Sequence, residues 1–418
     1  MSLSNIQALE TSKPLNMVDK TAKNIIIKLL TQIKKSQLTL IDKEQSFVFG
    51  NKNASLKAII HINNPKTYKR LLLGGAIAAG ESYIDGWWSS PDLTKVIQVL
   101  AREKQLKEGL EKSFSKVITK AFVFPKWLFH KARKNTKSGS KQNILAHYDL
   151  GNEMYKTFLD KEMMYSSAIY PNADATLEEA QLHKLDTICQ RLALKPGESL
   201  LEIGTGWGAL AIYAAQHYGV TVTTTTISDA QYEYTKERID SLGLNDRITL
   251  LSNDYRELEG QFDKLVSIEM IEAVGHEYLG SFFETCNRHL KPGGKMLLQA
   301  ITIADQRYDQ YRKGVDFIQR YIFPGGCLPS INVMASKVAN QTDMVITGVD
   351  DIGQDYAQTL KHWSERFESA LPDIQKMGYG QDFIRLWQFY FAYCEGAFRE
   401  RNISTVHMTA VKSTCGEQ

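Results

Sequence analysis

Apolar and polar positions follow a mixed pattern over the first hundred residues. A helical periodicity runs from Ile25 to Leu38, and short runs of β-branched and aromatic residues follow at 46–49 and 58–62. A second helical pattern, 72–79, leads into residues 80–88, which contain glycine, tyrosine and two tryptophans. These elements predict a small domain of mixed α/β structure.

Farther along the chain, short apolar runs alternate with helical patterns. The first of these helices begins at a capping box made by Thr176 and Glu179. Such alternation predicts a parallel sheet with helices on both faces. The predicted strands are 199–203, 220–226, 247–251, 264–268 and 295–300, followed by late helices at 356–371 and 382–398 and a final strand at 406–412.

Length and composition fit two globular domains without a membrane span. The chain has 418 residues, 43% of them hydrophobic and 23% charged, with a formal net charge of +3. No apolar run approaches the roughly 18 residues that cross a bilayer, and the first residues lack the apolar core of a signal peptide. We therefore expect a cytoplasmic protein. Five scattered cysteines show no metal-ligand spacing, so no metal site is expected.

The segment 112–141 has a composition of its own, with nine Lys or Arg residues and no Asp or Glu. Phenylalanines and Trp127 lie between the basic residues. We predict that it links an N-terminal domain, 1–111, to a catalytic domain, 142–418, and touches the anionic inner face of a membrane peripherally. A solvated surface is the first alternative. Nucleic-acid binding is the second, although no base-reading motif lies nearby.

Three glycines follow the strand 199–203, namely Gly204, Gly206 and Gly208, and the helical pattern 209–217 comes next. Glycines let the backbone turn tightly and let a ligand approach closely. A later Leu-Lys-Pro-Gly-Gly run at 290–294 stands before the fifth strand. This order resembles the class I methyltransferases, which bind S-adenosylmethionine. The resemblance implies a Rossmann-like α/β fold with a mostly parallel, seven-stranded sheet.

A cofactor in such a sheet lies across the carboxyl ends of the strands. Glu202 and the three glycines are therefore candidates to contact S-adenosylmethionine. Gln231, after the second strand, is placed for the ribose, and Asp254, after the third strand, for the adenine edge. Two alternatives remain open: Asp254 caps a helix, or the glycines form a plain tight turn.

A longer set of motifs resembles the cyclopropane fatty acid synthases, a family that includes the mycolic acid cyclopropane synthases. The resemblance implies that Tyr165, Ser166 and Thr226 also contact the cofactor, and that the N-terminal domain guides lipid. The matching stretches are 80–88, 147–152, 165–168, 201–208, 226–231, 254–256, 321–324, 328–330 and 363–367.

The resemblance also implies an activity: methyl transfer from S-adenosylmethionine to the cis double bond of an unsaturated acyl chain in a membrane phospholipid. Loss of a proton from the former methyl group then closes a cyclopropane. In this family the base is thought to be a bound bicarbonate, held at cysteine, glutamate, histidine and tyrosine positions. Those positions fall on Ser167, Glu272, Gln299 and Tyr356.

Two of these positions depart from the family. Ser167 replaces the cysteine and Gln299 replaces the histidine, and a glutamine can donate a hydrogen bond but cannot relay a proton. Bicarbonate binding is therefore left open, and so is the product, which could be a ring, a methylene group or a methyl branch. A binding protein without turnover is the rival from another class. Glu272 as a helix-terminal carboxylate and Tyr356 as a core aromatic remain alternatives.

Some properties are not fixed by the sequence. A homo-oligomer, the double-bond position, the acyl length and the head group all stay open. A nucleic-acid methyltransferase is disfavoured, because the chain has neither an Asn/Asp-Pro-Pro-Tyr motif nor a Pro-Cys motif.

Overall fold

The computed structural model describes residues 17–43, 45–103 and 151–414. The chain divides into two compact units, residues 1–122 and 123–418. The basic segment 112–141 lies outside the described residues, so the predicted limits of the two domains and their linker stay a prediction.

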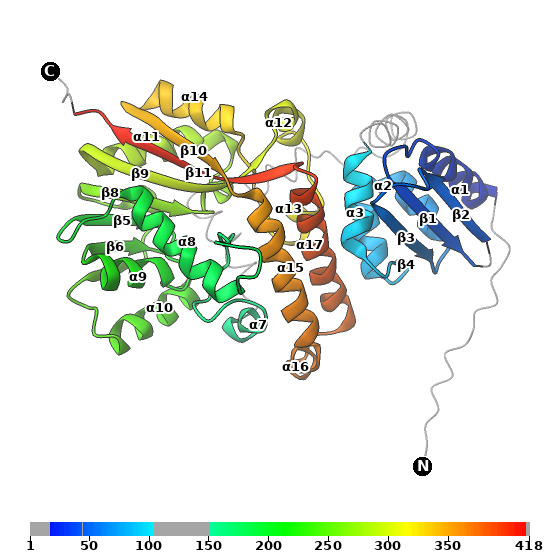
Figure 1. Ribbon diagram of the computed structural model, residues 1–418, viewed down its shortest axis with the longest axis horizontal. Coiled ribbons are helices and arrows are strands. Elements are labelled where there is room, and N and C mark those ends of the chain that lie inside the picture. Colours follow the sequence, from blue (N-terminus) through cyan, green and yellow to red (C-terminus); the bar gives the residue numbers. More distant parts are fainter. Residues whose placement is uncertain (1–16, 44, 104–150, 415–418) are drawn as a thin grey trace, which may run out of the picture. The chain divides into compact units, whose positions relative to one another are not determined.

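The N-terminal unit is a four-stranded mixed sheet with three described helices (Figure 1). Strand order is β2-β1-β3-β4; β1 pairs antiparallel with β2 and parallel with β3. The elements are α1 (Met17–Leu30), β1 (Gln37–Asp42), β2 (Gln45–Gly50), β3 (Lys57–Ile62), α2 (Lys66–Ile84), β4 (Trp88–Ser89) and α3 (Leu93–Arg102).

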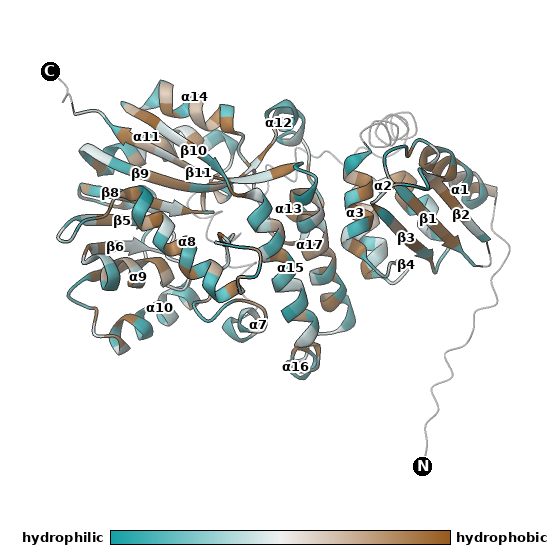
Figure 2. Cartoon of the chain, viewed as in Figure 1, coloured by the Kyte–Doolittle hydropathy of each residue, from teal (hydrophilic) through white to brown (hydrophobic). Residues whose placement is uncertain are grey.

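The predicted helix from Ile25 to Leu38 is wrong in its second half. The helix α1 ends at Leu30, and Leu38 belongs to β1, where it is fully buried together with Leu40. Apolar residues two apart fit a strand, and pairing with β2 and β3 satisfies the backbone there. In Figure 2 the strands β1 to β3 are largely brown, in keeping with their apolar sequences.

The second unit contains a seven-stranded sheet of order β10-β11-β9-β8-β5-β6-β7. The strands β9, β8, β5, β6 and β7 are parallel, whereas β11 runs antiparallel to both β9 and β10. This confirms the predicted mostly parallel sheet. The strands are β5 (Ser199–Ile203), β6 (Thr221–Thr225), β7 (Ile248–Leu251), β8 (Phe262–Ile268), β9 (Leu290–Ile303), β10 (Met344–Asp351) and β11 (Ile403–Lys412).

Helices cover both faces of this sheet (Figure 1). Apolar residues of α8, α9 and α10 share one buried cluster with the strands, and those of α11 and α14 share another. The predicted capping box of Thr176 and Glu179 opens α8. The helices are α7 (Asn152–Lys156), α8 (Leu177–Leu192), α9 (Ala209–Tyr218), α10 (Asp229–Ser241), α11 (Leu279–His289), α12 (Asp305–Tyr311), α13 (Phe317–Tyr321), α14 (Ile331–Gln341), α15 (Gly353–Ser369), α16 (Leu371–Lys376) and α17 (Gln381–Arg399).

A third buried cluster is rich in aromatic side chains, and we call it the aromatic cluster. It draws on α7, α15, α16 and α17, and Figure 1 shows α15 and α17 side by side beyond one end of the sheet. Its large members include Tyr155, Phe158, Trp207, Tyr356, Trp363, Phe367, Trp387, Tyr390 and Phe391, with Tyr165 and Phe323 packed against it. None of the helices in the described ranges has the length and apolar content to cross a membrane.

Candidate active site

The predicted glycine turn joins β5 to α9, and all three glycines have positive φ angles. A β-carbon on Gly208 (φ +88°) would lie 2.7 Å from Thr235 Cγ2. On Gly206 (φ +56°) a β-carbon would meet no atom within 4 Å. Gly204 (φ +97°) is intermediate, with Met270 at 3.4 Å. The open space beside Gly206, whose backbone is in the left-handed region, would let a ligand approach the backbone closely.

Glu202 lies one residue before the end of β5 and is buried. The Thr224 hydroxyl on the neighbouring strand β6 donates a 2.6 Å hydrogen bond to its carboxyl group. Burial raises the pKa of Glu202 to about 8, which favours the neutral acid at pH 7. Glu202 therefore helps to join β5 to β6, and its contact with the cofactor stays a prediction.

The candidates after the second and third strands lie at the same edge of the sheet as the glycine turn. The Thr226 hydroxyl donates to Gln231 Oε1 at 2.8 Å, and both side chains are buried. Asp254 accepts from the backbone N–H of Arg256 and pairs with its guanidinium at 2.6 Å. The capping alternative for Asp254 is thus present, and its role toward adenine stays a prediction.

The segment of Tyr165 and Ser166 contacts two different environments. The Tyr165 hydroxyl donates to the Tyr390 hydroxyl at 3.0 Å, within the aromatic cluster. The buried Lys184 ammonium donates to Ser166 Oγ at 2.8 Å, and burial lowers the pKa of Lys184 to about 8. The segment therefore connects the aromatic cluster to a buried polar group.

Three of the four predicted catalytic residues meet around one carboxylate, that of Glu269. Its Oε1 accepts from the backbone N–H of Ser167 at 3.0 Å and from Gln299 Nε2 at 2.6 Å. Its Oε2 accepts from the Tyr356 hydroxyl at 2.9 Å. Glu269 is not among the candidate residues predicted from the sequence. Its position directly after β8, at the carboxyl edge of the sheet, is the signal that could have found it.

Glu269 has an unusual backbone conformation for a residue that is not glycine. Its φ is +48°, in the left-handed region, and its N–H donates to the carbonyl oxygen of Gln299 at 2.8 Å. Burial raises the pKa of its carboxyl group, while the three donors and the positive charge of Lys184 act in the opposite direction. The structure thus holds a carboxylate in place at a cost in backbone energy.

The orientation of Gln299 is fixed by two residues that were not predicted from the sequence. Arg191 Nη1 lies 2.7 Å from His407 Nδ1, and an arginine can only donate. The proton of His407 is therefore on Nε2, which donates to Gln299 Oε1 at 2.8 Å. Burial, and then the charge of Arg191, lowers the pKa of His407 to about 3. A neutral His407 thus leaves the Gln299 amide N–H₂ facing Glu269.

Glu272 lies inside a short 3₁₀ turn, η2 (Ile271–Ala273), and is separate from this hydrogen-bond set. Its Oε1 accepts from the backbone N–H of Ile301 on β9. Its Oε2 is buried and has no hydrogen-bond partner among the described residues. Burial and the nearby charge of Glu269 raise the pKa of Glu272 to about 8. The site therefore contains two carboxyl groups, those of Glu269 and Glu272, and the charge of the first raises the pKa of the second.

Comparison with known sequences places the chain in a family. The sequence model described as "Mycolic acid cyclopropane synthetase" matches residues 135–408. The cyclopropane-fatty-acyl-phospholipid synthase of Escherichia coli K12 is 39% identical over 357 residues, which are 84% of this chain and 87% of that protein. The tuberculostearic acid methyltransferase UfaA1 of Mycobacterium tuberculosis is 34% identical, over 82% of this chain and 81% of that protein.

Solved structures agree with the sequence comparisons. The cyclopropane synthase MmaA2 of Mycobacterium tuberculosis has a TM-score of 0.61 and 29% identity, and covers 65% of this chain and 98% of its own. The mycolic acid cyclopropane synthase CmaA1, solved with SAH and CTAB, has a TM-score of 0.61 and 30% identity with the same coverage. The chain therefore belongs to the cyclopropane fatty acid synthase family of S-adenosylmethionine-dependent methyltransferases.

Proposed function

We propose that this protein transfers a methyl group from S-adenosylmethionine to the cis double bond of an unsaturated acyl chain in a membrane phospholipid, and forms a cyclopropane. One observation carries the proposal: Ser167, Gln299 and Tyr356 donate to a single carboxylate beside the aromatic cluster. The name of the relative from Escherichia coli supports the same substrate class.

We propose that the residues around the glycine turn hold the cofactor. Their backbone and polar groups suit its amino-acid, ribose and adenine parts. Bound S-adenosylmethionine would supply an electrophilic methyl group. The proposed contacts are Tyr165, Ser166, Glu202, Gly204, Gly206, Gly208, Thr226, Gln231 and Asp254.

The chain's own residues suit a reaction that passes through a cation. Tyr356 packs edge-on against Trp363 at 6.0 Å and stacks on Phe398 at 4.6 Å. Such surroundings exclude water, and their ring faces attract positive charge. We propose that Ser167, Glu272, Gln299 and Tyr356 act on the side of the reaction that accepts a proton.

A methylene- or methyl-branched product is the second candidate. The relative from Mycobacterium tuberculosis is named a tuberculostearic acid methyltransferase and is 34% identical to this chain. Gln299, which stands where the family resemblance expects a histidine, is also compatible with a different fate of the cation. Both candidates use the same methyl transfer. A ring or a methylene group then forms by loss of a proton, whereas a methyl branch also needs a separate reduction of the methylene group.

We further propose that residues 112–141 bring the enzyme to its lipid. The segment carries nine Lys or Arg residues and several aromatic residues, a composition that suits the anionic inner face of a membrane. This proposal depends on the sequence, because the segment lies outside the described residues.

Expression in a host that lacks cyclopropane fatty acids tests the activity. Gas chromatography and mass spectrometry of the total fatty acids should show a new species that is heavier than an unsaturated precursor by one CH₂ unit for a ring or a methylene group, or by CH₂ plus two hydrogens for a saturated methyl branch. Fragmentation and hydrogenation would distinguish a ring from a methylene group or a methyl branch. Unmodified unsaturated lipids in cells that contain folded, cofactor-binding protein would contradict both candidates.

A further inference from the structure

We propose that the carboxylate of Glu269 occupies the position that the family resemblance assigns to bicarbonate, and that Glu269 is the base that accepts the proton. The inference rests on the proposed function. It concerns a residue of this chain that takes over a role expected of a free anion.

Three of the four positions that the resemblance assigns to bicarbonate, all except Glu272, are already engaged by Glu269. The Ser167 N–H, Gln299 Nε2 and the Tyr356 hydroxyl lie 3.0, 2.6 and 2.9 Å from its carboxylate oxygens. A carboxylate and a bicarbonate present the same pair of oxygens to such donors. A free bicarbonate therefore does not fit the donor set that the resemblance assigns to it.

The carboxylate keeps the capacity to accept a proton. Two carboxylate oxygens offer about four lone-pair positions. The three donors occupy two positions on Oε1 and one on Oε2. The remaining position on Oε2 lies on a half-buried side chain at the carboxyl edge of the sheet.

The departure at Gln299 becomes understandable under this inference. The contact from His407 to Gln299 Oε1 fixes the glutamine as a donor toward Glu269. A residue beside a built-in base needs only to orient it and need not relay a proton. Glutamine meets that requirement.

The backbone of Glu269 is an independent observation in favour of function. Left-handed conformations of residues other than glycine persist where the surroundings enforce them, and they cluster at active sites. Glu269, with φ +48°, is one of five such residues in the described ranges. Its side chain joins residues that are 30 to 102 positions away in the sequence.

The proposed step is balanced in atoms and electrons. The π electrons of the alkene form a bond to the incoming methyl carbon, and the bond from that carbon to sulfur breaks with both electrons left on sulfur. The neighbouring alkene carbon then carries the positive charge. A proton leaves the former methyl carbon for Glu269 Oε2, and the C–H electrons form the third side of the ring. Glu269 returns the proton to water when the product leaves.

Removal of bicarbonate and replacement of Glu269 together test the inference. The wild-type protein is assayed on vesicles of unsaturated phospholipid in CO₂-free buffer, with and without added sodium bicarbonate. We expect equal rates of product formation. Glu269→Gly should lose at least a hundred-fold in rate without bicarbonate and regain a substantial part of it with bicarbonate, because glycine suits the backbone and leaves room for the anion. Glu269→Gln should be inactive under both conditions.

A matched control comes from another residue in the left-handed region. Arg401 has φ +51° and is exposed, so Arg401→Gly changes the backbone in the same way without touching the site. This variant should keep wild-type activity in both buffers. Melting temperature and calorimetric titration of S-adenosylmethionine should show that the Glu269 variants fold and bind the cofactor. If Glu269→Gly does not fold, the inference is tested by the wild-type rates with and without bicarbonate and by the activity of Glu269→Gln.

The outcomes separate this inference from the proposed function. A wild-type enzyme that forms product only with bicarbonate would overturn the inference and leave the function standing. Full activity of Glu269→Gly without bicarbonate would also overturn it, as would a folded Glu269→Gly that stays inactive at every bicarbonate concentration. Wild-type protein that modifies no unsaturated lipid in either buffer would overturn both.

Discussion

Gln299 illustrates how distant side chains determine the chemistry of one amide. Arg191 fixes the tautomer of His407, His407 fixes the amide of Gln299, and the amide then donates to Glu269. Because arginine can only donate, the first contact decides which atom donates in the second, and the second decides it in the third. The donor role of Gln299 follows from this order, although the residue itself could either donate or accept.

Substitution of Gln299 should therefore reduce activity without abolishing binding. Gln299→Leu removes a hydrogen bond to a charged group, worth roughly 1.5–3 kcal/mol. Such a loss corresponds to about ten- to a hundred-fold in rate if it is felt in the transition state. Gln299→His should keep ring formation, since an imidazole N–H can replace the amide N–H. Rates on phospholipid vesicles and the affinity for S-adenosylmethionine are the measurements.

Gln358 offers a matched control for that substitution. Its amide lies 3.0 Å from a ring nitrogen of His362, so it also contacts a histidine, but the structure shows it in no contact with Glu269. Gln358→Leu should leave the rate within a few-fold of wild type. Equal losses in both leucine variants would indicate a general effect of repacking and would remove Gln299 from the mechanism.

Glu202 should make the stability of the fold depend on pH. Its pKa of about 8 in the folded protein lies above its ordinary value of 4.5, because the side chain is buried. The folded state therefore holds a proton that the unfolded state releases, and stability falls as the pH rises from about 4.5 to 8. The slope contributed by one such group is at most about 1.4 kcal/mol per pH unit.

Glu202→Gln removes this titration while keeping the shape of the side chain. Relative to wild type, the variant should gain stability between pH 5 and pH 8, as measured by urea unfolding. The stability of this variant should still fall with rising pH, but less steeply than that of wild type, because the pKa of Glu272 is also raised. The exposed Glu259 is the control, and Glu259→Gln should run parallel to wild type. Parallel curves for Glu202→Gln as well would contradict a buried neutral acid.

Among the structural elements, the turn between β5 and α9 is the one that we propose lies against the cofactor. All three of its glycines have positive φ, and at Gly206 the space for a β-carbon is open. Gly206→Val should block S-adenosylmethionine, because the branched side chain would occupy the space beside the turn. Calorimetric titration should show at least a hundred-fold loss of affinity.

Gly197 separates this effect from backbone strain. It also has a positive φ, +86°, and a β-carbon at that position would meet no atom within 4 Å. Gly197→Val should cost a similar amount of stability, about 1–2 kcal/mol, while binding the cofactor normally. An unchanged affinity in Gly206→Val would mean that the cofactor lies elsewhere.

The sequence predicts the elements better than it predicts the contacts between them. Repeating strand and helix patterns identified five parallel strands, whereas β10 was not predicted and the helix from Ile25 ran too far. Between Leu30 and Leu38, the spacing of the apolar residues fits a helix as well as a strand, and only the pairing of β1 with its neighbours in the sheet decides between the two. Ser167, Gln299 and Tyr356 could be named from motifs. Glu269 was missed, and only its position directly after a predicted strand pointed to it. His407 carried no such signal, because its partner Gln299 lies far away in the chain and meets it only in the folded sheet.

For the molecule as a whole, attraction to a membrane should depend on where its charge lies. The net charge is only +3, yet nine basic residues fall within 112–141. Neutralising Lys112, Lys116, Lys120 and Lys126 with glutamine should weaken binding to anionic vesicles and lower activity on bilayers more than cofactor affinity. Rising salt should have the same effect, since the Debye length is about 8 Å at physiological ionic strength.

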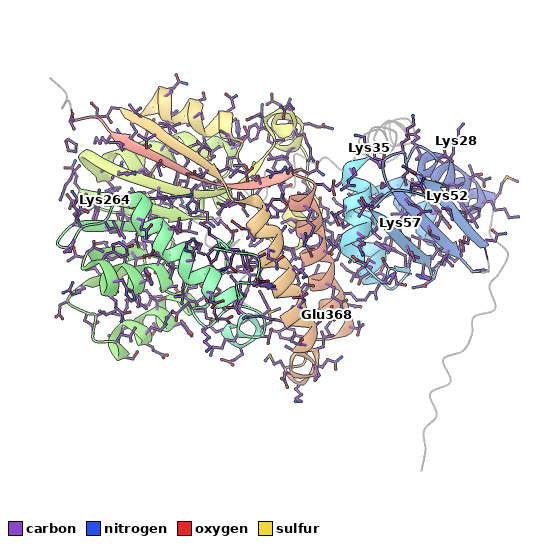
Figure 3. All side chains as sticks on the ribbon, in the orientation of Figure 1. Lys28, Lys35, Lys52, Lys57, Lys264 and Glu368 are labelled. Carbon is purple, nitrogen blue, oxygen red and sulfur yellow. The ribbon has the colours of Figure 1, made fainter. Side chains whose placement is uncertain are left out.

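The N-terminal unit supplies a control with the same change in charge. Its exposed Lys28, Lys35, Lys52 and Lys57 are labelled in Figure 3. Glutamine at those four positions should affect vesicle binding less than the substitutions in 112–141. Equal losses would indicate that total charge matters rather than the segment, and salt-insensitive binding would assign the segment to an ordinary solvated surface.

Because the carboxylate of Glu269 is part of the chain, the occupancy of its donor set does not depend on the concentration of any solute. A diffusible anion occupies its site only in proportion to its concentration, and other small anions compete for the same donors. A side chain that fills those donors is present in every molecule, at an effective concentration that no solute matches. Borate, nitrate or acetate should then leave the turnover of this enzyme unchanged, and its rate should not follow the supply of dissolved carbon dioxide.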